Sequence, residues 1–368
     1  MTTFSTLTTM KVGGSPAGYH EFTTTRSLVS GAKKIWAETD QWMALGSGSN
    51  LVVCDEGIDD TVLHIKTRGV TVKKATGQKV QIHAEAGEDW DGFVAHTVAQ
   101  GVRGLETLSG IPGTVGASVI QNIGAYGAEV SDTLVSIDFL EYPSGSRRTV
   151  AAAELDLGLR TSALKTGALQ GLVLGVTFSL EPAEEGMSIP LRYEQLHTAV
   201  GAQEGERAPL ALVREAVLAL RGSKGMLLSD ADPDSVSSGS FFLNPIVSER
   251  VAWGLPQGAP RWLVDPEPED VVIPLGEDTA LPPSAVVGGD VAVKVSAAWL
   301  IEYSGIPKGF SLPGSRAAIS SKHSLAITNR GGATAAEVAE LARYVITTVG
   351  NACGIYLVPE PTLVGLEL

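Results

Sequence analysis

Cysteine is scarce in this chain of 368 residues, since Cys54 and Cys353 are the only two and both lie in mostly apolar surroundings. Neither belongs to a metal-binding spacing, so no metal site is expected and reduced thiols are the default. A surplus of positive charge is missing too. The formal net charge is −14, which argues against broad binding to nucleic acids or anionic membranes but leaves room for a local basic pocket.

Long apolar runs are also absent. No stretch approaches the ~18 apolar residues of a membrane-spanning helix. The opening Met-Thr-Thr-Phe-Ser-Thr-Leu-Thr-Thr has neither the basic start nor the apolar centre of a signal peptide. With 44% hydrophobic and 18% charged residues, the composition suits a globular enzyme of two or three domains. We therefore expect a cytoplasmic monomer with no membrane or nucleic-acid partner.

Hydrophobic periodicity predicts a mixture of strands and helices, that is, an α+β protein. Strands are expected over residues 42–45, 51–53, 61–65, 70–74, 80–84, 134–142 and 171–180. Helices are expected over residues 89–100, 209–221 and 296–303, and another opens at the capping-box pattern Thr334-Ala-Ala-Glu337. A shift to polar, turn-rich composition places a domain change near Gly222. Loops are expected around residues 259–290, and the acidic residues of 265–290 have no assigned role.

What the sequence does have is glycine, concentrated between Gly101 and Gly127. Glycines recur at every third position from 110 to 116, and Pro112 prevents a continuous helix there. The backbone must turn repeatedly with its N–H groups uncovered by side chains. Such a surface suits a ligand with many acceptor oxygens, such as a diphosphate or the edge of a flavin ring.

A second glycine loop, Gly46-Ser-Gly-Ser-Asn50, lies between two expected strands. It lacks the third glycine of a Rossmann fingerprint and the lysine of a Walker motif. Taken alone, it is typical of a tight turn. Together with the stretch 101–127, it indicates a dinucleotide held by main-chain N–H groups.

Three side chains stand out for chemistry. Ser240, in Gly239-Ser-Phe-Phe-Leu-Asn-Pro245, either enters a core strand or donates a proton to a developing carbanion. No Gly-x-Ser-x-Gly elbow is present, which argues against a hydrolase triad. Arg160 and Glu360 lie in apolar surroundings. They form either a structural ion pair or a site in which the arginine holds a carboxylate or enolate oxygen and the glutamate tunes a proton.

Together these motifs resemble one family, the UDP-N-acetylenolpyruvoylglucosamine reductases, which are flavoenzymes of peptidoglycan precursor synthesis. The resemblance runs through Lys11-Val-Gly-Gly-Ser-Pro-Ala17, Leu45-Gly-Ser-Gly-Ser-Asn-Leu-Val-Val53, the segment 104–127, Gly239–Pro245 and Leu357-Val-Pro-Glu360. Any one motif is moderately specific, whereas five in this order are highly specific.

The resemblance implies a fold and a division into domains. It predicts an FAD-binding fold of the vanillyl-alcohol oxidase (PCMH) type in two subdomains, followed by an α/β substrate-binding domain. The first subdomain is expected over residues 1–68 and the second over 69–222, joined by 355–368. The substrate-binding domain is expected over 223–354.

The resemblance also implies a reaction in two steps. NADPH reduces FAD and leaves, and the enolpyruvyl ether of UDP-N-acetylglucosamine then enters. It takes hydride from flavin N5 at C3 and a proton at C2, giving UDP-N-acetylmuramate. Ser240 would deliver that proton, while Arg160 and Glu360, the latter protonated or sharing a proton, would stabilise the enolate-like state.

Binding residues follow from the same resemblance. FAD would be held by Gly46, Ser47, Gly48, Ser49, Asn50, Leu51, Ser109, Gly110, Pro112, Gly113, Thr114, Gly116, Ala117, Asn122, Gly124, Ala125, Tyr126 and Gly127. Tyr193, Lys224 and Asn244 would contact the nucleotide sugar, and Tyr193 marks a form of the family with a substrate-covering loop. Two positions depart from the family pattern. Leu243 replaces a residue that is often polar or basic, and Tyr303 replaces a glutamine of some members.

Two other functions fit parts of the pattern. Another FAD enzyme of the same fold, such as an oxidase of a small alcohol or sugar, would often tether FAD through His or Cys. Neither flavin loop offers such a side chain. A non-catalytic flavin- or nucleotide-binding protein would bind FAD without turnover. The oxidase also does not account for Ser240 together with Glu360.

Overall fold

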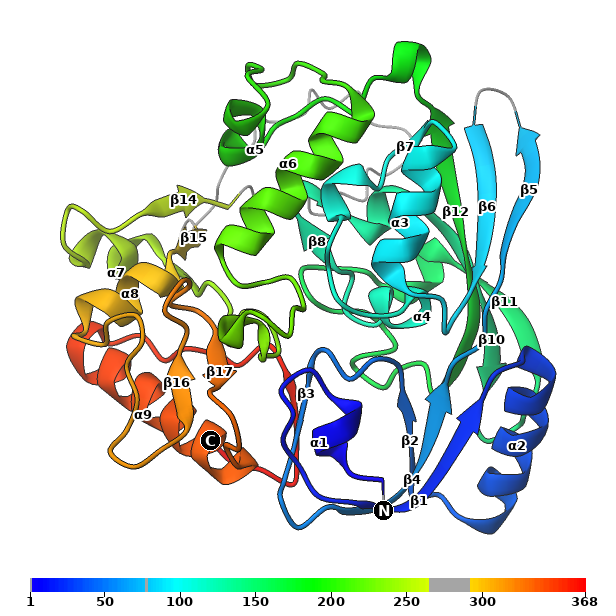
Figure 1. Cartoon of the computed structure of the whole chain (residues 1–368), viewed down its shortest axis with the longest axis horizontal. Coiled ribbons are helices and arrows are strands. Elements are labelled where there is room, and N and C mark those ends of the chain that lie inside the picture. Colours follow the sequence, from blue (N-terminus) through cyan, green and yellow to red (C-terminus); the bar gives the residue numbers. More distant parts are fainter. Residues whose placement is uncertain (1, 77–78, 265–291) are drawn as a thin grey trace, which may run out of the picture.

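The computed structural model describes residues 2–76, 79–264 and 292–368. After the short helix α1 (Phe4–Leu7), the chain forms a parallel sheet in the order β1 (Pro16–Phe22), β4 (Ile58–Ile65), β2 (Trp42–Leu45). Helix α2 (Thr25–Glu38) lies beside this sheet in Figure 1 and buries Leu28, Ala32 and Ile35. Their spacing of three and four residues puts them on one helix face.

A larger antiparallel sheet follows. Its strand order is β11 (Arg147–Ala151), β10 (Leu134–Glu141), β12 (Gly171–Pro182), β6 (Lys79–Glu85), β5 (Val70–Thr76), and β7 (Val102–Arg103) pairs with the end of β12. Strand β12 is buried along most of its length because it runs in the middle of this sheet. Apolar residues of β12 are therefore buried on both faces of the sheet, which accounts for its nearly continuous apolar run.

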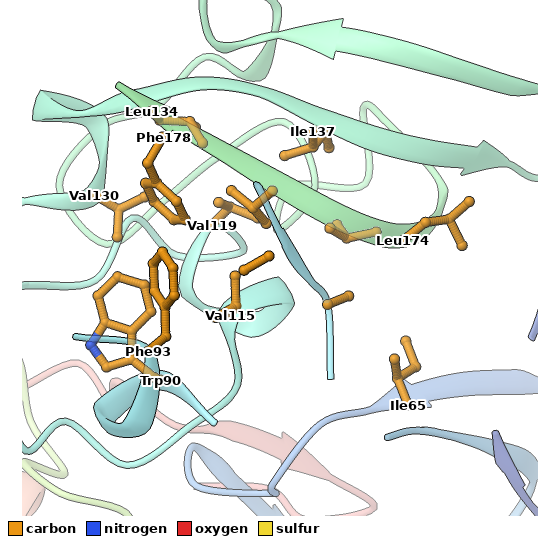
Figure 2. Packing of buried hydrophobic residues seen from close by; sticks show 14 of the residues in the cluster. Ile65, Trp90, Phe93, Val115, Val119, Val130, Leu134, Ile137, Leu174 and Phe178 are labelled. Carbon is orange, nitrogen blue, oxygen red and sulfur yellow. The ribbon is translucent and has the colours of Figure 1, made fainter. Parts of the chain in front are cut away.

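Helix α3 (Trp90–Ala99) and the one-turn helix α4 (Val115–Ser118) cover one face of the larger sheet (Figure 1). Figure 2 shows Trp90 and Phe93 directed at Phe178 of β12. The ring centroids of Trp90 and Phe93 lie 6.0 and 5.3 Å from that of Phe178, within the range of favourable aromatic contacts. The indole N–H of Trp90 also donates to the carbonyl of Leu108 at 3.0 Å. This packing holds the part of the glycine-rich stretch around Leu108 in place.

Helices α5 (Glu194–Ala199) and α6 (Leu210–Ser223) form a small core of their own around Leu196, Val213 and Val217. Helix α6 packs on the 3₁₀ turn η1 (Glu106–Leu108). The short strands β8 (Gly124–Ala125) and β9 (Ala128–Glu129) form a hairpin after α4.

The last third of the chain builds a second large core, to which Met10, Val12 and Val52 also contribute. Strands β13 (Ile246–Ser248), β15 (Ala292–Val295) and β14 (Arg261–Leu263) form one sheet, and β16 (Ala317–Ile319) pairs with β17 (Ile327–Asn329). Around them lie α7 (Glu249–Gly254), α8 (Ala297–Tyr303) and α9 (Ala335–Cys353). The predicted capping box of α9 is confirmed. Its expected stripe, Val338, Leu341, Val345 and Val349, is fully buried.

The C-terminal segment crosses back to the start of the chain. Strand β18 (Thr362–Val364) pairs in parallel with β3 (Leu51–Val53). We expected residues 355–368 to join the second FAD subdomain, whereas this pairing attaches them to a strand of the first. The three-domain division stays a prediction.

The predicted elements are present, and the structure also contains elements that were not predicted, among them β1, α2, α5, α7, β16 and β17. The ranges 42–45, 51–53 and 209–221 correspond to β2, β3 and α6, and the other expected strands and helices also form. The expectation of loops around 259–290 is wrong at β14, because antiparallel pairing with β15 draws residues 261–263 into a sheet. The acidic segment 265–290 lies outside the described residues.

Candidate active site

A cleft of about 360 Å³ lies where these parts of the chain meet. Its lining comes from residues 43–51, from 111–124, from 238–240 and from single residues farther along, including Arg160, Arg221 and Glu360. The two predicted flavin loops and all three predicted catalytic residues therefore line one cavity. They lie far apart in the chain, and a hydrogen bond from Asn50 to the carbonyl of Glu360 joins residues that are 310 positions apart.

The first loop, residues 46–50, turns tightly between β2 and β3. Gly48 has a φ of +61°, and a Cβ there would lie 2.4 Å from the carbonyl oxygen of Leu7. Glycine is therefore required at this position both by conformation and by space. The hydroxyl of Ser49 donates to the carbonyl of Pro112 at 2.9 Å, which joins this loop to the second one.

The second loop, residues 109–124, packs its backbone against the larger sheet. The N–H of Gly116 donates to the carbonyl of Ala86 at 2.8 Å, and a Cβ on Gly116 would lie 2.6 Å from the Ala86 side chain. Gly113 has a φ of +154°. The glycines of this loop thus allow close backbone packing on one side while the other side lines the cleft.

The cleft fits a ligand held mainly by backbone and small polar groups. The hydroxyls of Ser47 and Ser238 are buried, line the cleft and have no hydrogen-bond partner within the described part of the chain. A buried hydroxyl without a partner costs free energy, so a bound group that pairs with both would be favoured. A side chain at Gly46 would meet the Thr114 hydroxyl at 2.7 Å and narrow the loop junction. These features match an extended, oxygen-rich cofactor such as FAD.

The predicted cofactor residues fall into two groups. Those that line the cleft are Gly46, Ser47, Gly48, Ser49, Asn50, Leu51, Pro112, Gly113, Thr114, Ala117 and Gly124. Those outside its lining are Ser109, Gly110, Gly116, Asn122, Ala125, Tyr126 and Gly127. Several residues of the second group support the loop on the side away from the cleft. Asn122, for example, is buried, and its side chain bonds Glu129 and the backbone N–H of Ser131.

Arg160 and Glu360 form an ion pair inside the cleft, with Arg160 Nε 3.0 Å from Glu360 Oε1. The guanidinium also donates to the carbonyls of Gly124 at 2.8 Å and Asn122 at 3.4 Å. Arg160 is thus anchored on the second glycine loop, and its own backbone is left-handed, with a φ of +56°. This strained conformation in a non-glycine residue is typical of functional positions.

The electrostatics of Glu360 are set by two opposing effects. Burial raises the pKa of this carboxyl, whereas Arg160 and Lys165 lower it, and the net pKa stays above the usual value. The ion pair therefore does not fully stabilise the carboxylate, and Glu360 can hold a proton more readily than an ordinary glutamate. Lys165 also lines the cleft, and the sequence analysis assigned it no role.

Ser240 lies on the segment next to Glu360, because the N–H of Glu360 donates to the carbonyl of Phe241 at 2.9 Å. Its half-buried hydroxyl has a neighbour that sequence reasoning missed. The Nε2 of His323 lies 3.4 Å from Ser240 Oγ. No local pattern connects the two, since 83 residues separate them.

The three predicted substrate residues lie outside the cleft lining. Tyr193 and Lys224 both contact Tyr126, the first edge-on at 5.4 Å between centroids and the second with Nζ 5.9 Å from the ring centre. They form a cluster near Arg221, whose charge acts on the Tyr126 hydroxyl. Asn244 instead accepts the N–H of Ala297 at the start of α8, a structural contact.

The two departures from the family pattern also lie away from the lining of the cleft. The backbone N–H of Leu243 donates to the carbonyl of Val358 at 2.9 Å. Tyr303 is exposed and stacks on Trp299 with 4.6 Å between ring centroids.

Among the described residues, no helix has the length and apolar character needed to cross a bilayer.

Comparisons with known proteins agree with this geometry. Residues 16–151 match the family model described as "FAD binding domain", and residues 232–364 match the C-terminal domain of UDP-N-acetylenolpyruvoylglucosamine reductase. The chain is 50% identical to the reductase of that name from Leifsonia xyli subsp. xyli, over 99% of this chain and 98% of the relative. It is 45% identical to the one from Saccharopolyspora erythraea, over 98% and 94%.

A crystal structure of UDP-N-acetylenolpyruvylglucosamine reductase from Thermus caldophilus shares the fold, with a TM-score of 0.62 and 22% identity over 99% of this chain and 97% of that one. An FAD-binding domain followed by this C-terminal domain, with the cleft where they meet, defines a flavin-dependent oxidoreductase. The predicted fold class is confirmed. More narrowly, the identities over nearly the full length mean that the chain belongs to the UDP-N-acetylenolpyruvoylglucosamine reductase family.

Proposed function

We propose that this protein uses FAD and NADPH to reduce the enolpyruvyl ether of UDP-N-acetylglucosamine to UDP-N-acetylmuramate, a step of peptidoglycan precursor synthesis. The observation that carries the proposal is the meeting of Ser240, Arg160 and Glu360 in the cleft lined by both glycine loops. The relatives are named as reductases of UDP-N-acetylenolpyruvoylglucosamine, which supports this substrate. Ser240, Arg160 and Glu360 are chemically suited to proton transfer and to stabilising the charge that develops.

The two glycine loops, residues 46–50 and 109–124, would hold FAD, which when bound would supply the hydride that the enolpyruvyl group receives. The residues of the cleft then face a negative charge that develops on C2 and the adjacent carboxylate. Arg160 provides a fixed cation, because Gly124 and Asn122 hold its guanidinium in place. A preorganised cation of this kind stabilises the transition state without having to reorient.

Glu360 would act as a neutral or proton-sharing partner of that charge. A fully ionised carboxylate beside the substrate carboxylate would repel it, and the raised pKa of Glu360 reduces this repulsion. Ser240 would then supply the proton to C2 from its half-buried hydroxyl. A positioned proton donor contributes ~10²–10⁴-fold to a rate.

Lys224 and Tyr193 are proposed to bind the nucleotide-sugar end of the substrate. Burial and the charge of Arg221 lower the pKa of Lys224, so an anionic diphosphate nearby would relieve that unfavourable environment. Both side chains already contact Tyr126 at one edge of the second glycine loop. Asn244 is kept in this proposal only as a structural support of α8.

The proposal is tested with purified holoenzyme under anaerobic conditions. The protein should be yellow, should bleach on addition of NADPH, and should regain its colour when the enolpyruvyl UDP-sugar is added. Covalently attached FAD would favour an oxidase of the same fold. Bleaching without recovery of colour would refute the proposed substrate, and bound FAD that NADPH cannot bleach would indicate a non-catalytic binding protein.

A further inference from the structure

His323 is an ionisable side chain beside the proposed proton donor, and the mechanism leaves it unused. Its Nε2 lies 3.4 Å from the hydroxyl oxygen of Ser240, at the long end of the hydrogen-bonding range. His323 belongs to the turn between β16 and β17, far from the glycine loops in the chain. Its position beside Ser240 therefore depends on how that turn is held.

The turn is tied down at several points. The N–H and hydroxyl of Ser321 donate to the two oxygens of Asp234 at 2.8 and 2.6 Å, and Lys322 Nζ lies 2.8 Å from Asp232. Asp234 is itself 3% exposed. The N–H of His323 donates to the hydroxyl of Ser320 at 3.2 Å. These bonds hold in place the backbone from which the imidazole projects.

A backbone hydrogen bond also joins the turn to the segment that carries Ser240. The N–H of Phe241, the residue after Ser240, donates to the carbonyl of Leu325 at 2.7 Å. The backbones on the two sides of the Ser240–His323 contact are thus joined directly. A contact fixed from both sides is suited to positioning a reacting group.

The surroundings of His323 keep its ring neutral. Burial lowers the pKa of His323 to about 4, with further lowering by Lys224, Lys308 and Arg221 against a small opposing effect of Glu302. At neutral pH the ring therefore carries one N–H hydrogen and one lone pair. A neutral ring can donate one hydrogen bond and accept another, but it is not a cationic acid.

We propose that His323 is a positioning residue for Ser240, donating its Nε2–H to the serine oxygen during proton transfer. This inference rests on the function proposed above. When Nε2 is the donor, the hydroxyl hydrogen of Ser240 points away from His323 and is free for transfer. If Ser240 donated to Nε2 instead, its hydrogen would be engaged by the histidine. The donated bond also stabilises the oxygen as it becomes negative.

Proton transfer from Ser240 to C2 leaves the protonation of His323 unchanged. The O–H bond of Ser240 breaks, the proton forms a new C–H bond at C2, and the electron pair stays on the serine oxygen as an alkoxide. That alkoxide, held by the Nε2–H, later takes a proton from water. The nearby cations Lys224 and Arg221 favour the alkoxide through the same positive potential that keeps His323 neutral.

The test compares His323→Leu, which removes the donor, with His323→Gln, whose amide N–H can replace Nε2–H. In anaerobic stopped-flow experiments, FAD reduction by NADPH should match wild type in both. Flavin reoxidation by the enolpyruvyl UDP-sugar should slow by ~10²-fold in the leucine variant, the typical cost of losing one such donor. The glutamine variant should stay within ~10-fold of wild type, and the substrate Kd should be unchanged in both.

If the leucine variant fails to bind FAD, His323→Asn takes its place, because its shorter amide cannot reach Ser240, and the same slow reoxidation is expected. Reoxidation at the wild-type rate in the leucine or asparagine variant would overturn the proposal. So would equal slowing in the glutamine variant, which would indicate a role in packing only. A wild-type enzyme that the substrate cannot reoxidise would instead refute the proposed function, which separates the two failures.

Discussion

Two arginine–carboxylate pairs in this molecule look alike, but the pKa values of their carboxyl groups are shifted in opposite directions. Arg214 of α6 holds Asp91 of α3 with two bonds of 2.7 and 2.8 Å, and the N–H of Gly110 adds a third of 2.6 Å. Burial alone would raise the pKa of Asp91, but these bonds outweigh it and lower the pKa. Asp91 is therefore a firmly ionised clamp between two helices.

The pair in the cleft has fewer bonds to its carboxylate. Glu360 accepts one bond from Arg160, whose other N–H groups go to backbone carbonyls of the second glycine loop. Burial then prevails, and the pKa of Glu360 is raised. The balance between burial and the donors that reach the carboxylate, and not the presence of an arginine alone, therefore decides the direction in which the carboxyl pKa moves.

The largest expected effect comes from replacing the carboxyl of the cleft pair by its amide. Glu360→Gln keeps the shape and an oxygen for Arg160 but cannot share a proton. Flavin reoxidation by the enolpyruvyl UDP-sugar should slow by ~10²-fold or more, whereas FAD reduction by NADPH should not change. The free energy of unfolding at neutral pH should change little, because Arg160 loses its charge partner while the cost of burying the Glu360 carboxylate is removed. Stopped-flow absorbance and urea titration measure the two quantities.

The same replacement in the clamp should have the reverse outcome. Asp91→Asn should lower the free energy of unfolding by about 1–3 kcal/mol, less than for a fully buried pair because the Asp91 side chain is 34% exposed. Both half-reactions should keep wild-type rates in the folded enzyme. Loss of activity without loss of stability would abolish the distinction between the two pairs.

A smaller effect is expected from pH. Because the pKa of Asp91 is lowered on folding, its contribution to stability is present above the unfolded pKa of about 3.9 and is lost as pH falls through the folded value. The difference in unfolding free energy between wild type and Asp91→Asn should therefore shrink below about pH 4. A difference that grows on acidification would contradict the assignment of Asp91 as the ionised partner. Urea titrations at a series of pH values provide the measurement.

The sequence predicted those features whose signals are local. The capping box at Thr334 and the alternating strands have fixed spacings, and they form where expected. Helix α2 was missed because serines, a glycine and β-branched residues weaken its helical propensity, although Leu28, Ala32 and Ile35 repeat at helical spacing. Tertiary packing against β4 stabilises it.

The site was predictable in its parts but not in its assembly. The glycine loops, Ser240, Arg160 and Glu360 were identified from motifs, and the cleft brings them together. His323 could not be found this way, because its contact with Ser240 depends on the Asp234 anchor and on the pairing of Phe241 with Leu325. Contacts between segments so far apart have no local signature in a single sequence.

The account is tested most directly by Ser240→Ala, measured in two anaerobic half-reactions. NADPH should reduce the FAD of this variant at nearly the wild-type rate, because the glycine loops are untouched. Reoxidation by the enolpyruvyl UDP-sugar should slow by at least the ~10²–10⁴-fold typical of a positioned proton donor. Reoxidation at the wild-type rate would remove Ser240 from the mechanism and contradict the central claim that one cleft joins the flavin loops to the proton donor.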